Sequence, residues 1–322
     1  MQTLLKNTQA YTLLKTEAEE NRFGHAYLLT FQDGRNLRRA LKEFAKLFFH
    51  GDQRISNLID TESFSDCLFF PAEGKKLAVD DAETIREEST LAPVEGERKL
   101  FVVGDFAEAN TQTQNKLLKL LEEPPKGVIF LLGATSVFPV LTTVLSRTKR
   151  LELLPFSTAD TTDCLERIYG DKYPREALEL CAATSDGNVG EAQNMLEGGQ
   201  YRTLLESAFE LALSAPAGLP LAVKKMGETK HQKELIALLR LIFRDALLMK
   251  TGQSQKHLLL RGERERVSQT AKKYASVALI YAQEALAEAE KQVRFNAVFA
   301  QCIELCLAKI QRKTNNKQKD FL

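Results

Sequence analysis

The sequence predicts an α/β domain with a doubly wound parallel sheet, followed by a part that is wholly helical. Two observations lead to this fold class. First, short apolar runs with the length of buried strands alternate with amphipathic helical segments over residues 1–156, which is the order of elements in a parallel sheet covered by helices. Second, no strand pattern follows Pro155, and the remainder is rich in Leu and Ala at helical spacing.

The elements of the first part can be placed in chain order. Apolar runs bounded by turn residues predict strands at residues 26–29, 67–70, 100–103, 128–135 and 150–154. Apolar residues at a spacing of three and four predict helices over residues 4–20, 37–49 and 79–88, and another around Leu117. This last helix is expected to end before Pro124 and Pro125, because a residue that precedes a proline is disfavoured in the α conformation.

The helical remainder is predicted to form two domains. Ser157, with Asp160 three residues later, resembles a helix N-cap in a capping-box arrangement. Gly198 and Gly199 form a credible linker. The predicted domains are therefore an α/β domain, a small helical domain and a larger helical domain, at residues 1–156, 157–199 and 200–322.

Composition and charge argue against several classes of function. The 322 residues contain 44 Lys and Arg against 43 Asp and Glu, for a net charge of +1. A protein that binds nucleic acid strongly by itself usually carries a basic excess, so we do not expect this chain to do so alone. No apolar run reaches the length of a membrane span, and the N-terminus lacks the pattern of a signal peptide. We expect a cytoplasmic protein.

The cysteines predict no metal site. Cys67 and Cys164 are isolated, Cys181 lies in a helical run, and Cys302 and Cys306 are one helical turn apart. No Cys-x-x-Cys occurs, and none of the four histidines lies near a cysteine pair. A zinc site at Cys302 and Cys306 would need two more ligands from elsewhere. Buried thiols in a reducing compartment are the preferred interpretation.

One stretch of the chain carries a family resemblance. Residues 115–125 read Asn-Lys-Leu-Leu-Lys-Leu-Leu-Glu-Glu-Pro-Pro, an apolar run follows, and Ser146, Arg147 and Thr148 come after it. This stretch resembles the clamp-loader branch of the AAA+ ATPases, and within it the delta prime subunits of bacterial DNA polymerase III. The resemblance implies an AAA+ RecA-like domain, a small helical lid and a C-terminal helical collar that joins subunits. Many delta prime relatives carry a four-cysteine zinc module, but residues 50–64 contain no cysteine.

The resemblance also locates a degenerate nucleotide site. In P-loop ATPases two glycines let the backbone wrap the phosphates, a lysine reaches the β- and γ-phosphates, and a hydroxyl holds magnesium. An ungapped match places Phe31 and Asn36 at the glycines, Leu37 at the lysine and Arg38 at the hydroxyl, with Gly34 between them. We therefore expect no bound nucleotide cofactor at this site.

The second catalytic element is also incomplete. After the strand at residues 100–103 the family has Asp-Glu, with Asp on the metal and Glu positioning the attacking water. Here Asp105 is followed by Phe106. The preferred interpretation of Asp105 is a residue that caps a turn at the end of a strand, and the alternative is a residual metal role. The region after Asp186 carries no arginine where many AAA+ lids place their second-sensor arginine.

Arg147 is the exception to these losses. The resemblance implies that Ser146 and Arg147 begin an arginine-finger motif whose guanidinium acts in trans on the ATP of a neighbouring subunit. Such an arginine is worth roughly 10³ to 10⁵ in rate in GTPases. The alternative is a solvated arginine in a basic loop with Lys149 and Arg150, or a contact to a phosphate backbone.

The expected function is that of a non-catalytic subunit in a DNA-directed DNA polymerase holoenzyme, with no ATPase activity of its own. The partners implied by the resemblance are the gamma/tau ATPase subunits and the delta subunit, with the sliding clamp and primer-template DNA reached through the assembly. One alternative is an active AAA+ ATPase or helicase loader with an atypical phosphate loop, and another is the clamp-opening delta subunit. The missing lysine and acidic pair favour the first interpretation over an ATPase.

Overall fold

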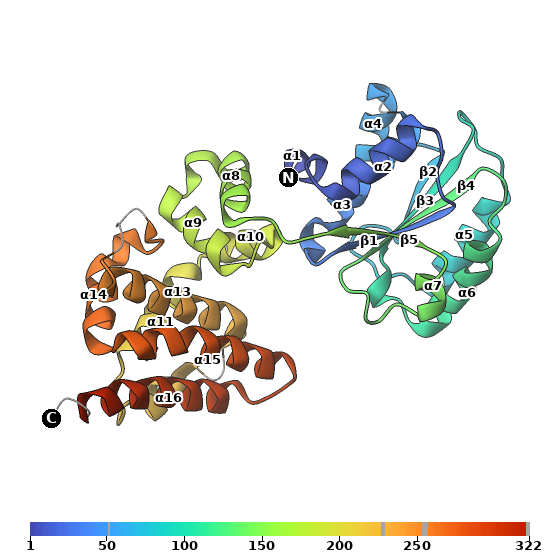
Figure 1. Ribbon diagram of the computed structural model, residues 1–322. Helices are drawn as coiled ribbons and strands as arrows, with labels where there is room; N and C mark the ends of the chain where they lie inside the picture. Colours follow the sequence, from blue (N-terminus) through green and yellow to red (C-terminus); the bar gives the residue numbers. More distant parts are fainter. Residues whose placement is uncertain (51, 227–228, 253–256, 320–322) are drawn as a thin grey trace. The chain divides into compact units, whose positions relative to one another are not determined.

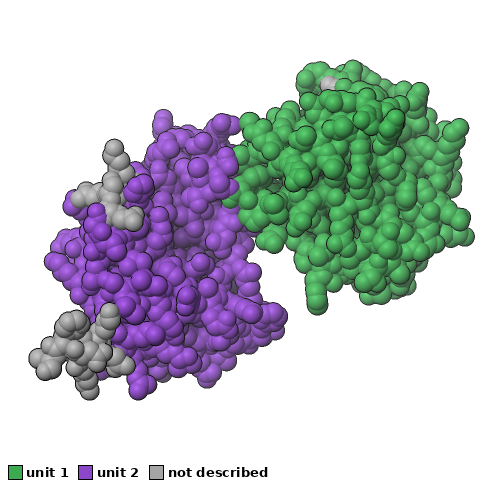
Figure 2. All heavy atoms as spheres, viewed as in Figure 1, with its two compact units in different colours: residues 1–156 green, residues 157–322 purple. Residues whose placement is uncertain are grey.

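The computed structural model describes residues 1–50, 52–226, 229–252 and 257–319. The chain divides into two compact units, Met1–Phe156 and Ser157–Leu322 (Figure 2). Unit 1 contains a five-stranded sheet, and the described residues of unit 2 form helices and their connections. The predicted fold class, α/β followed by all-α, is confirmed.

The sheet of unit 1 is parallel throughout and has the strand order β2-β3-β4-β1-β5 (Figure 1). Its strands are β1 Ala26–Phe31, β2 Cys67–Phe70, β3 Lys99–Asp105, β4 Val128–Ala134 and β5 Lys149–Leu153. All seven residues of β4 are buried, because helices cover both faces of a parallel sheet of this kind. Each of the five predicted strands is present.

Helices cover the sheet on two faces and create two apolar cores (Figure 1). Alternate residues of β1 enter different cores: Leu29 packs with Leu41 of the helix that follows β1, and Leu28 packs in the other core with Leu117. This alternation is the two-residue period of a strand. The helices of unit 1 are α1 Gln2–Lys6, α2 Gln9–Glu19, α3 Gly34–Ala45, α4 Gln53–Asp60, α5 Val79–Ser89, α6 Thr111–Glu122 and α7 Thr142–Leu145.

The prediction of one helix over residues 4–20 is wrong, because the chain turns between α1 and α2. Thr8 is the N-cap of α2, and its hydroxyl oxygen accepts a hydrogen bond from the Tyr11 amide at 3.2 Å. The same hydroxyl donates to the Leu5 carbonyl at 2.7 Å. These hydroxyl bonds of Thr8 satisfy backbone groups where the helix is interrupted. The spacing of apolar residues does not predict this interruption.

Unit 2 is built from helices of 8 to 21 residues. They are α8 Thr158–Tyr169, α9 Arg175–Thr184, α10 Val189–Glu197, α11 Tyr201–Leu213, α12 Leu219–Met226, α13 Gln232–Lys250, α14 Arg264–Lys273, α15 Ser276–Arg294 and α16 Phe299–Lys319. Ser157 caps α8 as predicted, since its side chain accepts from the Asp160 amide at 3.1 Å. The division of this unit into lid and collar at residue 199 stays a prediction. None of the helices formed by the described residues is long and apolar enough to cross a membrane.

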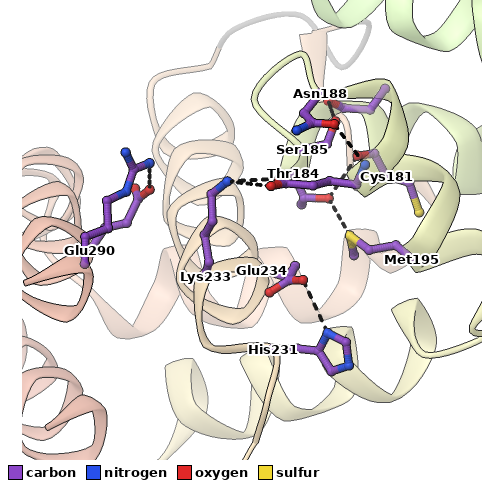
Figure 3. A network of polar contacts seen from close by, with 12 residues as sticks. Cys181, Thr184, Ser185, Asn188, Met195, His231, Lys233, Glu234 and Glu290 are labelled. Carbon is purple, nitrogen blue, oxygen red and sulfur yellow. Dashed lines mark hydrogen bonds and ion pairs between the residues drawn. The ribbon is translucent and has the colours of Figure 1, made fainter. Parts of the chain in front are cut away.

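An ion pair joins α10 to the longer helix α13 in unit 2. Lys233 on α13 forms an ion pair with Glu191 on α10, with Nζ 2.9 Å from Oε2 (Figure 3). Close by, the buried Thr184 hydroxyl lies 3.4 Å from the Met195 sulfur and joins α9 to α10. The side chains of α10 therefore link the predicted lid to the predicted collar within this unit.

Candidate functional site

The turn between β1 and α3 is the position where a P-loop protein would hold phosphates. It consists of Gln32 and Asp33, and Asp33 is the N-cap of α3. Asp33 Oδ1 accepts from the Asn36 amide at 3.1 Å, and Oδ2 accepts from Asn36 Nδ2 at 2.8 Å. Both side chains are buried, at 1% and 4% exposure. A helix N-terminus attracts anions, and here a carboxylate of the chain itself occupies that position.

The residues matched to the phosphate loop lie in apolar surroundings. Phe31 is 3% exposed and packs edge to face on Phe156, with ring centroids 6.0 Å apart. Leu37 is 3% exposed and belongs to the core under α3. A Cβ on Gly34 would lie 3.3 Å from the Thr135 methyl group, so this glycine permits close packing of α3 on the segment after β4.

Arg38 is committed to contacts within unit 1. Its Nε donates to Glu62 Oε1 at 2.6 Å, its Nη1 donates to the Pro71 carbonyl at 3.0 Å, and its guanidinium lies 5.6 Å from the Phe69 ring centroid. Lys42 also pairs with Glu62 at 2.9 Å. Burial raises the pKa of Glu62, but the contacts with Arg38 and Lys42 outweigh it, and the net pKa is lowered. Arg38 thereby ties α3 to the segment after α4 and to the residue that follows β2.

Asp105 joins the ends of two neighbouring strands. Its Oδ1 accepts from the backbone amides of Thr135 at 3.0 Å and Ala107 at 3.2 Å, and its Oδ2 accepts from the Thr135 hydroxyl at 2.6 Å. Phe106 is fully buried in the core between the sheet and α6. Our sequence reasoning missed Thr135, although a polar residue directly after an apolar strand was a usable signal.

Arg147 lies directly after α7, at the surface of unit 1. Its Nη1 donates to the Thr143 carbonyl at 2.9 Å and to the Ser146 hydroxyl at 3.1 Å. Its Nη2 lies 2.7 Å from Glu122 Oε1, and the arginine side chain is 35% exposed. Ser146 is the C-cap of α7, and its hydroxyl donates to the Thr143 carbonyl at 3.1 Å. The structure thus brings the two predicted finger residues together with a glutamate of the Leu-Glu-Glu-Pro-Pro motif.

A buried glutamine fixes the segment that leads to α7. Gln114 on α6 is 1% exposed, and its Oε1 accepts from the Leu141 amide at 2.9 Å. Its Nε2 donates to the carbonyls of Ala109 and Pro139, each at 3.1 Å. Sequence reasoning missed this residue, because a glutamine beside Asn115 in an amphipathic helix is typical of a solvent-facing position.

The described residues contain no group of three histidine, cysteine, aspartate or glutamate side chains that could hold a metal ion. All five cysteines are free thiols. Burial raises the pKa of the Cys181 thiol and of the Cys306 thiol to about 12, so both stay protonated near neutral pH. The absence of zinc stays a prediction.

Comparisons with known proteins find DNA polymerase III subunits among the similar sequences. A family model described as "DNA polymerase III, delta subunit" matches residues 6–157. The delta prime subunit of Bacillus subtilis is 25% identical over 260 residues, which cover 76% of this chain and 78% of that protein. The tau subunit of the same organism is 24% identical over 284 residues, which cover 78% of this chain.

The chain spans half the length of the Bacillus subtilis tau subunit. The tau subunit of Escherichia coli is 28% identical over 185 residues, which cover 54% of this chain and 28% of that protein. Among solved structures, a gamma subunit-related protein of Thermotoga maritima is similar with a TM-score of 0.42 and 18% identity, covering 95% of this chain and 100% of that one.

Proposed function

The chain belongs to the clamp-loader subunit family of DNA polymerase III, and from this premise we propose that it is a non-catalytic subunit of the delta prime type. In this proposal it assembles in the cytoplasm with gamma/tau ATPase subunits and a delta subunit. It binds no nucleotide of its own and donates Arg147 to the ATP of a neighbour. It reaches the sliding clamp and primer-template DNA through the assembly.

The observation that carries this proposal is the turn between β1 and α3. A triphosphate approaching the start of α3 would meet the Asp33 carboxylate where a P-loop presents free backbone amides. Displacing Asp33 would also break its bonds to the buried Asn36. The position of the phosphate-binding lysine is held by Leu37, which is buried in the core. These contacts support a subunit without ATPase activity.

The second element supports the same conclusion. Hydrolysis needs a carboxylate that positions the attacking water, and Phe106 occupies that place within the core. The Asp105 carboxylate already accepts hydrogen bonds from Thr135 and Ala107. An active ATPase with an atypical loop is therefore disfavoured. The clamp-opening delta subunit is disfavoured because the chain keeps both Glu-Glu-Pro-Pro and Ser-Arg.

Arg147 is the residue of this domain that we propose to contact a partner subunit. Its guanidinium is partly exposed at the end of α7, so a phosphate on another subunit can reach it. A domain that binds no nucleotide has no phosphate of its own for this arginine. The proposed finger therefore acts in trans, where it would neutralise charge that develops on the transferred phosphoryl group.

The test is reconstitution of the full complex with wild-type or Arg147→Ala chain. We expect unchanged assembly in gel filtration, since a partly exposed arginine at a loop usually contributes little to stability. Hydrolysis at the neighbouring ATP site, stimulated by DNA and clamp, should fall by roughly 10³-fold. Arg147→Lys should restore little, because an ammonium lacks the planar fork that spans two phosphate oxygens. Unchanged hydrolysis and clamp loading with Arg147→Ala would contradict the proposal.

A further inference from the structure

The two motifs that carry the family resemblance meet at one ion pair. Glu122 is the last residue of α6 and the first glutamate of Leu-Glu-Glu-Pro-Pro. Its Oε1 lies 2.7 Å from Nη2 of Arg147, which follows α7. Figure 1 shows α7 beside α6 in unit 1. Nothing in the sequence spacing alone predicts this contact, and the proposed role of Arg147 does not by itself require it.

The guanidinium has polar contacts at both terminal nitrogens, and the side chain stays 35% exposed. Nη1 uses its two hydrogens on the Thr143 carbonyl and the Ser146 hydroxyl, and Nη2 faces Glu122. Within the part of the chain that the structure describes, these are the polar contacts of Arg147. An arginine has five N–H donors, so the Nε hydrogen and one Nη2 hydrogen stay available for phosphate oxygens.

The helices α6 and α7, which position Glu122 and Arg147, are tied to each other. Pro124 and Pro125 end α6 directly after the glutamates, which fixes where Glu122 lies. The buried Gln114 of the same helix bonds to Leu141, the N-cap of α7. The helix that carries Glu122 is therefore tied to the helix that precedes Arg147.

A contribution to the stability of the fold does not explain the ion pair between Glu122 and Arg147. The side chains of Arg147 and Glu122 are 35% and 44% exposed, and ion pairs at such exposure contribute little to folding. The ion pair instead restricts the rotamers of the long Arg147 side chain. An arginine that is already oriented does not lose that rotamer freedom when it meets its ligand, and this improves the geometry of the reacting complex.

From this geometry we infer that Glu122 is a positioning residue, which holds the guanidinium of Arg147 in the orientation that meets a neighbouring subunit's ATP. The inference rests on the proposed function of Arg147 in trans and adds a residue to it. The carboxylate and the Thr143 carbonyl hold the two terminal nitrogens, and the γ-phosphate takes the two donors that remain.

The first test compares Glu122→Ala with a matched control, Glu123→Ala, in the reconstituted complex. Glu123 is the exposed C-cap of the same helix. We expect Glu122→Ala to lower kcat for ATP hydrolysis about 3- to 10-fold, the equivalent of ordering one long side chain, with KM for ATP unchanged. Glu123→Ala should match wild type, and the double variant Glu122→Ala/Arg147→Ala should match Arg147→Ala alone.

Three outcomes separate this inference from the proposed function. If Arg147→Ala lowers kcat but Glu122→Ala leaves it unchanged or raises it, Glu122 does not position the finger and the inference fails alone. A loss from Glu122→Ala that persists in the Arg147→Ala background means that Glu122 acts elsewhere, which also overturns it. An Arg147→Ala complex with wild-type rate overturns both.

A second measurement needs no partner subunit. The NMR order parameter of the Arg147 Nε–H bond in the full chain reports how tightly the guanidinium is held. We expect it to fall in Glu122→Ala and to stay at the wild-type value in Glu123→Ala. Equal order parameters in the wild type and Glu122→Ala would show that the carboxylate does not orient the arginine, and the inference would be wrong.

Discussion

At the scale of single residues, the proposal that this domain binds no nucleotide depends on one carboxylate. The start of α3 has the amides and dipole that favour a phosphate, but Asp33 supplies the negative charge internally and bonds to Asn36. In the proposed function, Leu37 supplies no charge that would attract ATP, and Asp33 adds a charge that repels it. We propose that this position serves as a structural cap of α3.

This account predicts the effect of removing that cap. Asp33→Ala should lower the free energy of unfolding by about 1 kcal/mol, the usual cost of losing a helix N-cap. Asp33→Asn should stay close to wild type, because an asparagine oxygen also accepts from backbone amides. Chemical denaturation measures both. Equal stability of Asp33→Ala and wild type would mean that the carboxylate does not cap α3.

At the scale of elements, the features that depend on local sequence pattern could be predicted. The five strands and the Ser157 cap are present as predicted. The pattern could not locate contacts between polar side chains far apart in the chain. Asp105 meets Thr135, and Glu122 meets Arg147, only because a parallel sheet brings successive strand and helix ends together. Thr8 divided a predicted helix because its hydroxyl bonds compete with helical geometry.

A pH-dependent contact between elements gives a second prediction. Arg38 and Lys42 on α3 hold the pKa of Glu62 below its ordinary value of 4.5. A lowered carboxyl pKa stabilises the fold above that ordinary value, and this contribution is lost as the pH falls through the lower, folded-state pKa. Arg38→Ala should therefore cost about 1 to 2 kcal/mol at pH 7.

The difference between Arg38→Ala and wild type should shrink as the pH falls below 4.5, where Glu62 becomes protonated in both proteins. Urea denaturation across this range measures it. Arg39→Ala, which truncates an exposed residue of the same helix, is the control and should have little effect at any pH. A difference that stays constant from pH 7 to pH 3 would show that the pairing with Glu62 is not its cause.

At the scale of the whole molecule, the proposed tasks are divided along the chain. The α/β unit carries Arg147, while the long helices of unit 2 expose apolar side chains that suit a partner surface. Ile280, Phe295, Val298 and Leu305, on and between α15 and α16, are 55–78% exposed. We propose that these exposed apolar side chains contribute to a protein interface.

The third prediction follows from this division. A fragment of residues 1–198 should fail to join the other subunits in gel filtration, because it lacks the region that we assign to assembly. Circular dichroism of the fragment checks that its α/β unit is folded. Full incorporation of the folded fragment into the complex would refute the assignment of residues 200–322 as the collar.

The central claim is that this subunit acts on a neighbour's ATP without binding any itself. Isothermal titration of the isolated chain with ATP and Mg²⁺ tests it most directly. We expect no binding heat at micromolar ATP and no turnover, since Asp33 occupies the helix N-terminus and Leu37 replaces the lysine. A micromolar dissociation constant accompanied by ATP hydrolysis would contradict the account.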